Sequence, residues 1–338
     1  MRPGTSQPQN TMLIDNFDRH VTYLRLSVTD RCDLRCIYCM SENMQFVARE
    51  QLLTLEEIVR VGKVFTELGV RKIRLTGGEP LTRRNILHAV RQLGQLPELK
   101  ELCLTTNGTQ LQRYAAELRA AGVNRINISL DSLNDENFTR ITRVGKLQQV
   151  IAGIDAAVSA GFERIKLNSV VMKHKNHDEV TDLVAFALER NIDISFIEEM
   201  PLGVTSNHDR AYAFYSSAEI LRDLGRRYSL VQTVETTGGP SRYYRISGSD
   251  SRIGFISPHS QNFCANCNRV RLTAEGRLLL CLGQENSVDL REIVRQHPQD
   301  DTPLRQAIVD SMAHKPLGHE FNLQQQPVIL RHMNVTGG

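Results

Sequence analysis

Residues 22–39 read TYLRLSVTDRCDLRCIYC, and this stretch decides the fold. Its first seven residues have the length and composition of a short β-strand. Three cysteines follow, Cys32, Cys36 and Cys39, in the spacing C-x3-C-x2-C. A strand that runs into three closely spaced thiols predicts a metal-binding loop at the carboxyl end of that strand.

The chain beyond this loop alternates between two kinds of segment. Five more β-like runs follow, at 72–77, 101–106, 125–130, 164–171 and 193–200. Amphipathic segments of helical period lie between them, at 53–69, 109–122, 146–161 and 177–191. Such alternation with short connections predicts parallel βαβ units. Six strands of this kind fit either an incomplete barrel or an open doubly wound sheet.

The pattern changes after about residue 235, where short strand-like runs and a helical region near 289–315 indicate a smaller α+β region. We therefore expect a disordered tail at 1–12, a core domain at 13–235 and a C-terminal region at 236–338.

Composition excludes several classes of protein. Hydrophobic residues make up 41% of the 338 residues and charged residues 23%, which is typical of a globular chain. The net charge of +3, from 41 basic and 38 acidic residues, is too balanced to predict a nucleic-acid binder. The sequence has neither a run of 18 apolar residues nor a secretory signal, so we expect a cytoplasmic protein away from membranes.

The thiols of the first loop are predicted to bind metal. Clustered cysteines in a chain of this size are more often metal ligands than disulfides. Three thiolates leave one iron of a [4Fe–4S] cube without a protein ligand, and an open position is typical of a catalytic metal. The alternative is a zinc site to which Cys103 or a distant histidine adds a fourth ligand.

This loop resembles the signature of the radical S-adenosylmethionine (SAM) enzymes, whose open iron binds SAM. Gly77-Gly78-Glu79-Pro80, after the next strand, resembles the GGEP element of that family, whose backbone and glutamate receive the amino group of SAM. The resemblance implies a partial (βα)6 barrel of the TIM type and one-electron cleavage of SAM to a 5′-deoxyadenosyl radical. The chemistry would then come from that radical, with no acid or base residue.

A second cysteine cluster lies in the C-terminal region. Cys264, Cys267 and Cys281 have the spacing C-x2-C-x13-C. They predict either a second [4Fe–4S] cube with an open iron or a zinc site with His259 as fourth ligand. Arg269 and Arg271 follow in a strand-like run, and alternation places both on one face.

Cations in other predicted strands extend this argument. Arg25, Arg74 and Lys166 lie within strands, where solvated charges are less expected. Together with Arg269 and Arg271 they predict a polyanionic ligand such as a nucleoside triphosphate. The chain has no G-x4-G-K-[ST] loop, so side chains would have to hold the phosphates.

The ordered set of motifs, which also includes FIEEMPLG at 196–203, resembles the branch of radical SAM enzymes that cyclises GTP in molybdenum cofactor biosynthesis. The resemblance implies two [4Fe–4S] clusters, one on Cys32, Cys36 and Cys39 and an auxiliary one on Cys264, Cys267 and Cys281. It implies that SAM is contacted by Tyr38, Gly78, Glu79, Ser129 and Met200. It implies that GTP is contacted by Arg25, Arg74, Thr105, Lys166, Arg269, Val270 and Arg271.

The resemblance extends to the C-terminus and to partners. Gly337 and Gly338 would enter the active site, although the family usually has an apolar residue where this chain has Thr336. The product would be 3′,8-cyclo-7,8-dihydro-GTP, passed to cyclic pyranopterin monophosphate synthase. A reductant protein would supply electrons, and a homodimer is compatible with these expectations.

Two alternatives remain open at this stage. One is a radical SAM enzyme that acts on a peptide or another substrate through its auxiliary cluster. The other is a zinc-stabilised binding module without catalysis.

Overall fold

The computed structural model describes residues 12–205, 208–325, 327 and 329–337. Its strands are β1 (Tyr23–Ser27), β2 (Lys72–Thr76), β3 (Glu101–Thr106), β4 (Arg125–Ser129), β5 (Arg164–Val170), β6 (Asp193–Ile197), β7 (Leu230–Gln232), β8 (Arg242–Ile246), β9 (Arg252–Ile256), β10 (Arg269–Leu272), β11 (Arg277–Leu279) and β12 (Ser287–Asp289). Its α-helices are α1 (Leu55–Glu67), α2 (Ile86–Gly94), α3 (Leu111–Ala120), α4 (Asp135–Thr142), α5 (Leu147–Ser159), α6 (Val180–Glu189), α7 (Arg210–Ala213), α8 (Ser217–Leu224), α9 (Leu290–Gln296), α10 (Thr302–Ser311) and α11 (Met333–Thr336).

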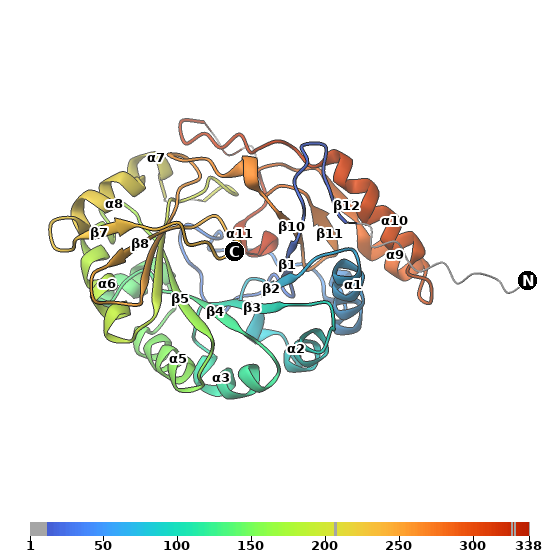
Figure 1. Ribbon diagram of the computed structural model, residues 1–338, viewed down its shortest axis with the longest axis horizontal. Coiled ribbons are helices and arrows are strands. Elements are labelled where there is room, and N and C mark those ends of the chain that lie inside the picture. Colours follow the sequence, from blue (N-terminus) through green and yellow to red (C-terminus); the bar gives the residue numbers. More distant parts are fainter. Residues whose placement is uncertain (1–11, 206–207, 326, 328, 338) are drawn as a thin grey trace, which may run out of the picture.

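These strands form one curved sheet in the order β12-β11-β10-β1-β2-β3-β4-β5-β6-β9-β8-β7. Strands β1 to β6 are parallel, and helices α1, α2, α3, α5 and α6 lie around the outside of the curve (Figure 1). Within the described residues the edge strands β12 and β7 do not pair, so the sheet stays open. The predicted partial barrel is therefore confirmed, and all six predicted strands are present.

The two faces of the sheet differ because side chains alternate along each parallel strand. On β1, Leu24 and Leu26 are fully buried in the hydrophobic core under the helices. Arg25, between them, instead lines a cavity inside the curve. The same alternation along β2 to β5 gives an apolar outer layer and a polar inner surface.

The chain after residue 235 extends the sheet at both edges. Strand β9 pairs in parallel with β6, and β8 and β7 continue antiparallel from it. Strand β10 pairs in parallel with β1 at the opposite edge, followed by β11 and β12. Among the described residues this region therefore shares the core sheet, and the boundary near residue 235 stays a prediction.

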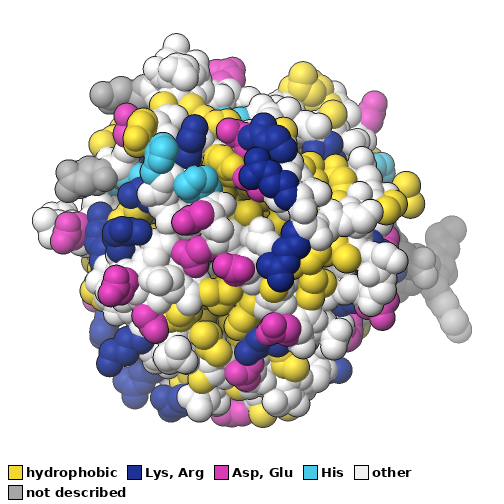
Figure 2. All heavy atoms as spheres, turned by 90° about the vertical axis from the view of Figure 1, so that its left-hand side faces the viewer, with side chains coloured by type: hydrophobic (Ala, Val, Ile, Leu, Met, Phe, Trp, Pro, Cys, Tyr) yellow, Lys and Arg dark blue, Asp and Glu magenta, His cyan; other side chains and the backbone are white. Residues whose placement is uncertain are grey.

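The outer surface carries charges of both signs. On the side occupied by α6 and α8, Lys and Arg side chains are interspersed with Asp and Glu and with hydrophobic side chains (Figure 2). None of the described helices combines the length and the apolar character that a membrane span requires.

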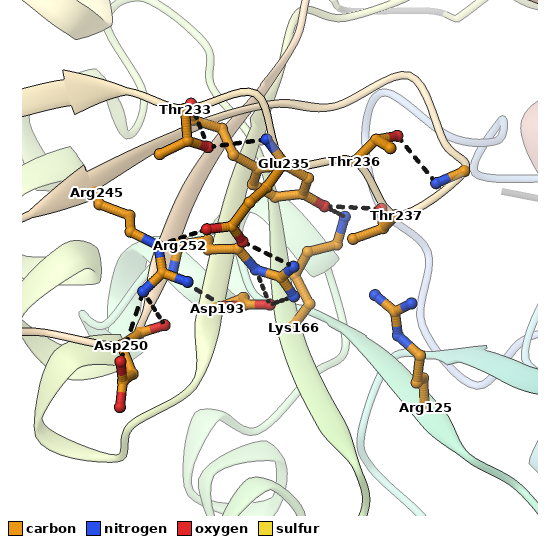
Figure 3. A network of polar contacts seen from close by, with 12 residues as sticks. Arg125, Lys166, Asp193, Thr233, Glu235, Thr236, Thr237, Arg245, Asp250 and Arg252 are labelled. Atoms are coloured by element: carbon orange, nitrogen blue, oxygen red, sulfur yellow. Dashed lines mark hydrogen bonds and ion pairs between the residues drawn. The ribbon is translucent and has the colours of Figure 1, made fainter.

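A buried ion pair joins β6 to β9. Asp193 accepts hydrogen bonds from the backbone N–H of Arg252 at 2.9 Å and from its Nη2 at 2.5 Å (Figure 3). Both side chains are at least nine-tenths buried, at 2% and 8% exposure. Glu235 Oε2 lies 3.5 Å from Arg252 Nη1 and is the weaker partner. This pair attaches the C-terminal part of the sheet to the βα repeats.

Replacing Asp193 tests this attachment. Asp193→Ala leaves the buried guanidinium with Glu235 alone, and we expect it to lower the free energy of unfolding by about 3 kcal/mol. The matched control is Asp250→Ala, because Asp250 is exposed and its Oδ1 lies 3.6 Å from Arg245 Nη1. Its effect should stay below about 1 kcal/mol. Equal urea denaturation midpoints for the two variants would contradict this account.

Candidate active site

One cavity inside the curve of the sheet is lined by both cysteine triads. Cys32, Cys36 and Cys39 border it from the loop after β1, and the second triad borders it from the C-terminal region. All six thiols are free and half-buried. In the described part of the chain, no three His, Cys, Asp or Glu side chains come together so as to hold one metal ion. In an iron–sulfur cube each cysteine binds a different iron, so its ligands need not meet at one point. Whether the triads suit such a cluster therefore depends on the chemistry of their donor atoms.

The first triad is held by the loop after β3. Asn107 Nδ2 lies 2.6 Å from Asp33 Oδ1 and 3.7 Å from Cys32 Sγ. Thr109 donates to the other oxygen of Asp33 at 2.7 Å, and the N–H of Leu34 donates to Cys32 Sγ at 3.4 Å. Donors aimed at a sulfur stabilise its thiolate form, which is the form that binds iron. The loop therefore suits a [4Fe–4S] cluster, for which its thiolates would be the ligands.

Gly78 sits where the GGEP turn crosses the cysteine loop. Its N–H donates to Thr29 at 2.7 Å, and a Cβ on Gly78 would lie 2.3 Å from the carbonyl oxygen of Arg31. No larger residue fits between these backbones. Gly78 itself lines the cavity, so its backbone is open to a ligand.

Glu79 is placed differently from the other predicted SAM contacts. It is fully buried and does not line the described cavity. Its carboxylate accepts hydrogen bonds from the N–H of Leu81 at 3.0 Å, Thr106 Oγ1 at 2.8 Å and the N–H of Asn107 at 2.6 Å. Burial raises the pKa of Glu79 to about 7. Glu79 thus holds the loop that supports Cys32, and its contact with SAM stays a prediction.

The other predicted SAM residues, Tyr38, Ser129 and Met200, line the cavity. The Tyr38 hydroxyl donates to Asp131 Oδ2 at 2.7 Å, which fixes the ring beside Cys39. Burial raises the pKa of Asp131 to about 6. The sequence placed Asp131 after β4 but did not indicate this contact, because the two residues are far apart in the chain.

All seven residues predicted to contact GTP line the same cavity: Arg25, Arg74, Thr105, Lys166, Arg269, Val270 and Arg271. The register explains this convergence, since Arg25 pairs with Arg271 on one side and with Arg74 on the other. Burial, together with the neighbouring Arg74 and Arg269, lowers the pKa of Arg25 to about 10. Burial likewise lowers the pKa of Arg271. Arg25 and Arg271 are half-buried, and Arg74 on the other side of Arg25 is buried. Adjacent cations with little access to water are costly unless an anion joins them, so the row favours a polyanionic ligand.

Lys72 and Tyr23 also line the cavity and were not predicted. Lys72 Nζ lies 2.6 Å from Glu101 Oε2 and donates to the carbonyl oxygen of Thr237 at 3.0 Å. The Tyr23 hydroxyl accepts from Arg74 Nε at 2.6 Å. Alternation along a strand places Tyr23 on the same face as Arg25, and Lys72 on the same face as Arg74. This two-residue period is the sequence signal that could have identified both residues.

The C-terminal end reaches this cavity. The N–H of Met333 donates to the carbonyl oxygen of Cys39 at 3.2 Å, and Arg271 Nη1 donates to that of Gly337 at 2.6 Å. Gly337 has φ of +78°, and a Cβ there would lie 2.1 Å from Thr76 Oγ1. Thr336 is fully buried and its hydroxyl donates to the carbonyl oxygen of Met333, so a polar residue is accommodated there. Gly338 lies outside the described residues.

The second triad lies in a more cationic setting than the first. Burial would raise the pKa of Cys267, but Arg269 and Lys315 outweigh it and the pKa falls below its usual value. His319 and Phe321 stack with ring centres 4.2 Å apart and line the cavity beside this triad. His259, the predicted alternative fourth ligand, instead bonds through Nε2 to the backbone oxygen of Glu199 at 2.8 Å.

Known protein families match the two halves of the chain. The model of the Radical SAM superfamily matches residues 26–187, and the model described as Molybdenum Cofactor Synthesis C matches residues 192–321. The crystal structure of Streptococcus suis SuiB aligns with a TM-score of 0.63 at 16% identity, covering 89% of this chain and 68% of that one. The structure of the same protein bound to S-adenosylmethionine aligns with a TM-score of 0.62 at 16% identity, and the alignment covers 94% of this chain and 78% of that one. At such identity the likeness shows the fold alone.

Curated relatives match nearly the whole chain. A GTP 3′,8-cyclase of Pseudomonas entomophila is 58% identical over 327 residues, which cover 96% of this chain and 98% of that protein. A GTP 3′,8-cyclase of Saccharophagus degradans is 56% identical over 330 residues, which cover 98% of this chain and 100% of that protein. The chain therefore belongs to the GTP 3′,8-cyclase family of the radical SAM superfamily.

Proposed function

We propose that this chain converts GTP to 3′,8-cyclo-7,8-dihydro-GTP, the first step of molybdenum cofactor biosynthesis, as a radical SAM lyase. The observation that carries the proposal is a single cavity bordered by two triads of free thiols and by a row of strand-borne cations. A catalyst that must bring SAM and a nucleoside triphosphate together needs both features in one chamber.

The thiol triads would hold the cofactors. Cys32, Cys36 and Cys39 are proposed ligands of the SAM-binding [4Fe–4S] cluster, and Cys264, Cys267 and Cys281 of the auxiliary one. When bound, the reduced cluster and SAM supply the radical that removes a hydrogen atom from the substrate. Tyr38, Gly78, Ser129 and Met200 would orient SAM, while Glu79 holds the supporting loop from behind.

The cations would bind the substrate. Arg25, Arg74 and Arg271 form the inner row, and Lys166 and Arg269 add charge beside it. Their guanidinium groups suit phosphate oxygens, so they would fix the triphosphate and thereby aim the ribose at SAM. Loss of a hydrogen atom at C3′ and bonding of the C3′ radical to C8 of guanine would leave an unpaired electron on the guanine ring. Uptake of one electron and one proton would then give the product. The partly buried chamber would keep water and other hydrogen donors from this step.

The partners follow from this chemistry. A separate reductant protein would supply two electrons, one for SAM cleavage and one for the guanine radical. Cyclic pyranopterin monophosphate synthase would consume the product. A homodimer is proposed as the assembly. The reducing cytoplasm is the proposed compartment, because it keeps free thiols available for cluster binding.

The direct test combines metal analysis with a product assay. Anaerobically reconstituted protein should contain about seven to eight irons per chain, as two cubes require. Incubation with SAM, a reductant and GTP deuterated at C3′ should give the cyclised product and deuterium in 5′-deoxyadenosine. About four irons, bound zinc or unlabelled 5′-deoxyadenosine would reject the proposal.

Two cysteine variants should separate the roles of the triads. Cys36→Ala should abolish SAM cleavage, because it removes a ligand of the SAM-binding cluster. Cys267→Ala should retain some SAM cleavage but stop cyclisation, measured as 5′-deoxyadenosine without product. Cys103→Ala is the control, since Cys103 is buried in β3 outside the cavity lining and its loss should leave the iron content unchanged. Identical behaviour of the first two variants would disprove this division.

Arg271→Ala should weaken GTP binding by about 1.5–3 kcal/mol, or roughly 10- to 150-fold in Kd, because it removes one charged hydrogen bond to the ligand. Isothermal titration of anaerobic protein measures the affinity. Arg226→Ala is the matched control, because the Arg226 side chain is 75% exposed and pairs with Asp223 on the surface. An unchanged affinity in Arg271→Ala would remove this residue from the GTP site.

A further inference from the structure

Lys315 is a buried cation that the proposed function does not use. It follows α10 and a short 3-10 helix (Met312–His314) and is 3% exposed. Its Nζ donates to the backbone oxygen of Leu280 at 2.7 Å and to that of Arg269 at 3.0 Å, and it lies 3.8 Å from Cys267 Sγ. None of the carboxylates in the described residues forms an ion pair with it.

These contacts tie the ligand segments of the second triad together. Leu280 immediately precedes Cys281, and Arg269 lies two residues after Cys267. One ammonium group thus holds the chain beside two of the three cysteines and touches the sulfur of one. Because all three contacts end on one nitrogen atom, a small displacement of Lys315 would move both cysteine segments.

The third cysteine is joined to the same segment through Arg19. Arg19 Nη1 donates to the backbone oxygens of Cys264 and Leu317, both at 2.8 Å, and Arg19 Nη2 donates to that of Pro316. A Cβ on Gly318 would lie 3.5 Å from Cys264 Sγ. Residues 315–318 therefore run along the whole triad, with Lys315 at the Cys267 and Cys281 end.

A buried ammonium group needs a negative counter-charge. The nearest group able to carry a negative charge is the Cys267 thiolate. A cluster bound by the three thiolates of this triad would be anionic as a whole. We propose that Lys315 is the counter-charge of the auxiliary cluster, a positioning residue that holds the Cys267 and Cys281 segments and raises the reduction potential of that cluster. The inference rests on the proposed function, because it requires an iron–sulfur cluster on the second triad.

The expected direction follows from charge. A cluster becomes one unit more negative when it takes up an electron, so an adjacent cation stabilises the reduced state. The first triad has a different environment, since the donors on Cys32 Sγ are the neutral amide of Asn107 and the N–H of Leu34. Removing Lys315 should therefore change the auxiliary cluster and leave the SAM-binding cluster unaltered.

Three substitutions separate charge from hydrogen bonding and from packing. Lys315→Gln keeps N–H donors without the charge, Lys315→Met keeps the unbranched apolar stem alone, and Lys315→Arg keeps the charge. Lys63→Met is the control, because Lys63 is an exposed lysine whose partner is Glu67 on the same helix. Each protein is reconstituted anaerobically, analysed for iron, and titrated with dithionite while the two cluster signals are followed by electron paramagnetic resonance.

We expect a lower midpoint potential for the auxiliary cluster in Lys315→Gln, and in Lys315→Met either the same shift or loss of about four irons per chain. Lys315→Arg and Lys63→Met should keep both clusters and nearly the original potential. If Lys315→Gln and Lys315→Met both keep the iron content and the auxiliary-cluster potential of the unaltered protein, the proposal is overturned. Loss of the cluster in all three Lys315 variants would also overturn it, because shape and not charge would then decide. If the unaltered protein binds only one cluster, the proposed function fails first, whatever the variants do.

Discussion

Strand β1 lies between two parallel neighbours, β2 and β10, and the rest of the site depends on this pairing. Parallel register aligns equivalent positions of the three strands, so Arg271, Arg25 and Arg74 face the cavity side by side. The alternate residues on β1, Leu24 and Leu26, point to the helices and are fully buried. A shift of one residue would exchange these two sets, placing the cations in the hydrophobic core. The apolar core on one face therefore fixes the charged row on the other.

The same pairing brings the two thiol triads to one chamber. The first triad lies in the loop after β1. In the second triad, Cys264 and Cys267 precede β10 and Cys281 follows β11. Because β10 runs parallel to β1, the segment from Cys264 to Arg271 is placed beside the start of the barrel and not in a separate lobe. The C-terminal end then passes between Cys39 and Arg271, so it touches both sides of the cavity. This arrangement suits a reaction in which two ligands must lie next to each other in one chamber.

The sulfurs of the two triads have electrically different neighbours. The donors on Cys32 Sγ are the neutral Asn107 and a backbone N–H, organised by the carboxylates of Asp33 and Glu79, while Arg35 Nη1 donates to the Cys32 backbone oxygen. At the second triad the cation Lys315 lies beside Cys267 Sγ, and Arg19 donates to the Cys264 backbone oxygen. Hydrogen bonds and charges beside ligated sulfurs are among the means by which a protein sets cluster potentials. The contrast at the sulfurs would give each proposed cluster its own electrostatic environment.

Local patterns in the sequence determined the strand–helix repeats, both cysteine triads, the Gly-Gly turn and the individual cations, because period and spacing are written within short segments. The partial barrel followed once the cysteine loop was compared with a known family. Only the tertiary structure decided that β10 joins β1, that Glu79 lies behind the cavity wall, that Tyr38 bonds to Asp131 and that Lys315 reaches Cys267. Each of these contacts joins residues separated by tens to hundreds of positions. Such contacts depend on strand register and on the packing of whole elements, which no local spacing encodes.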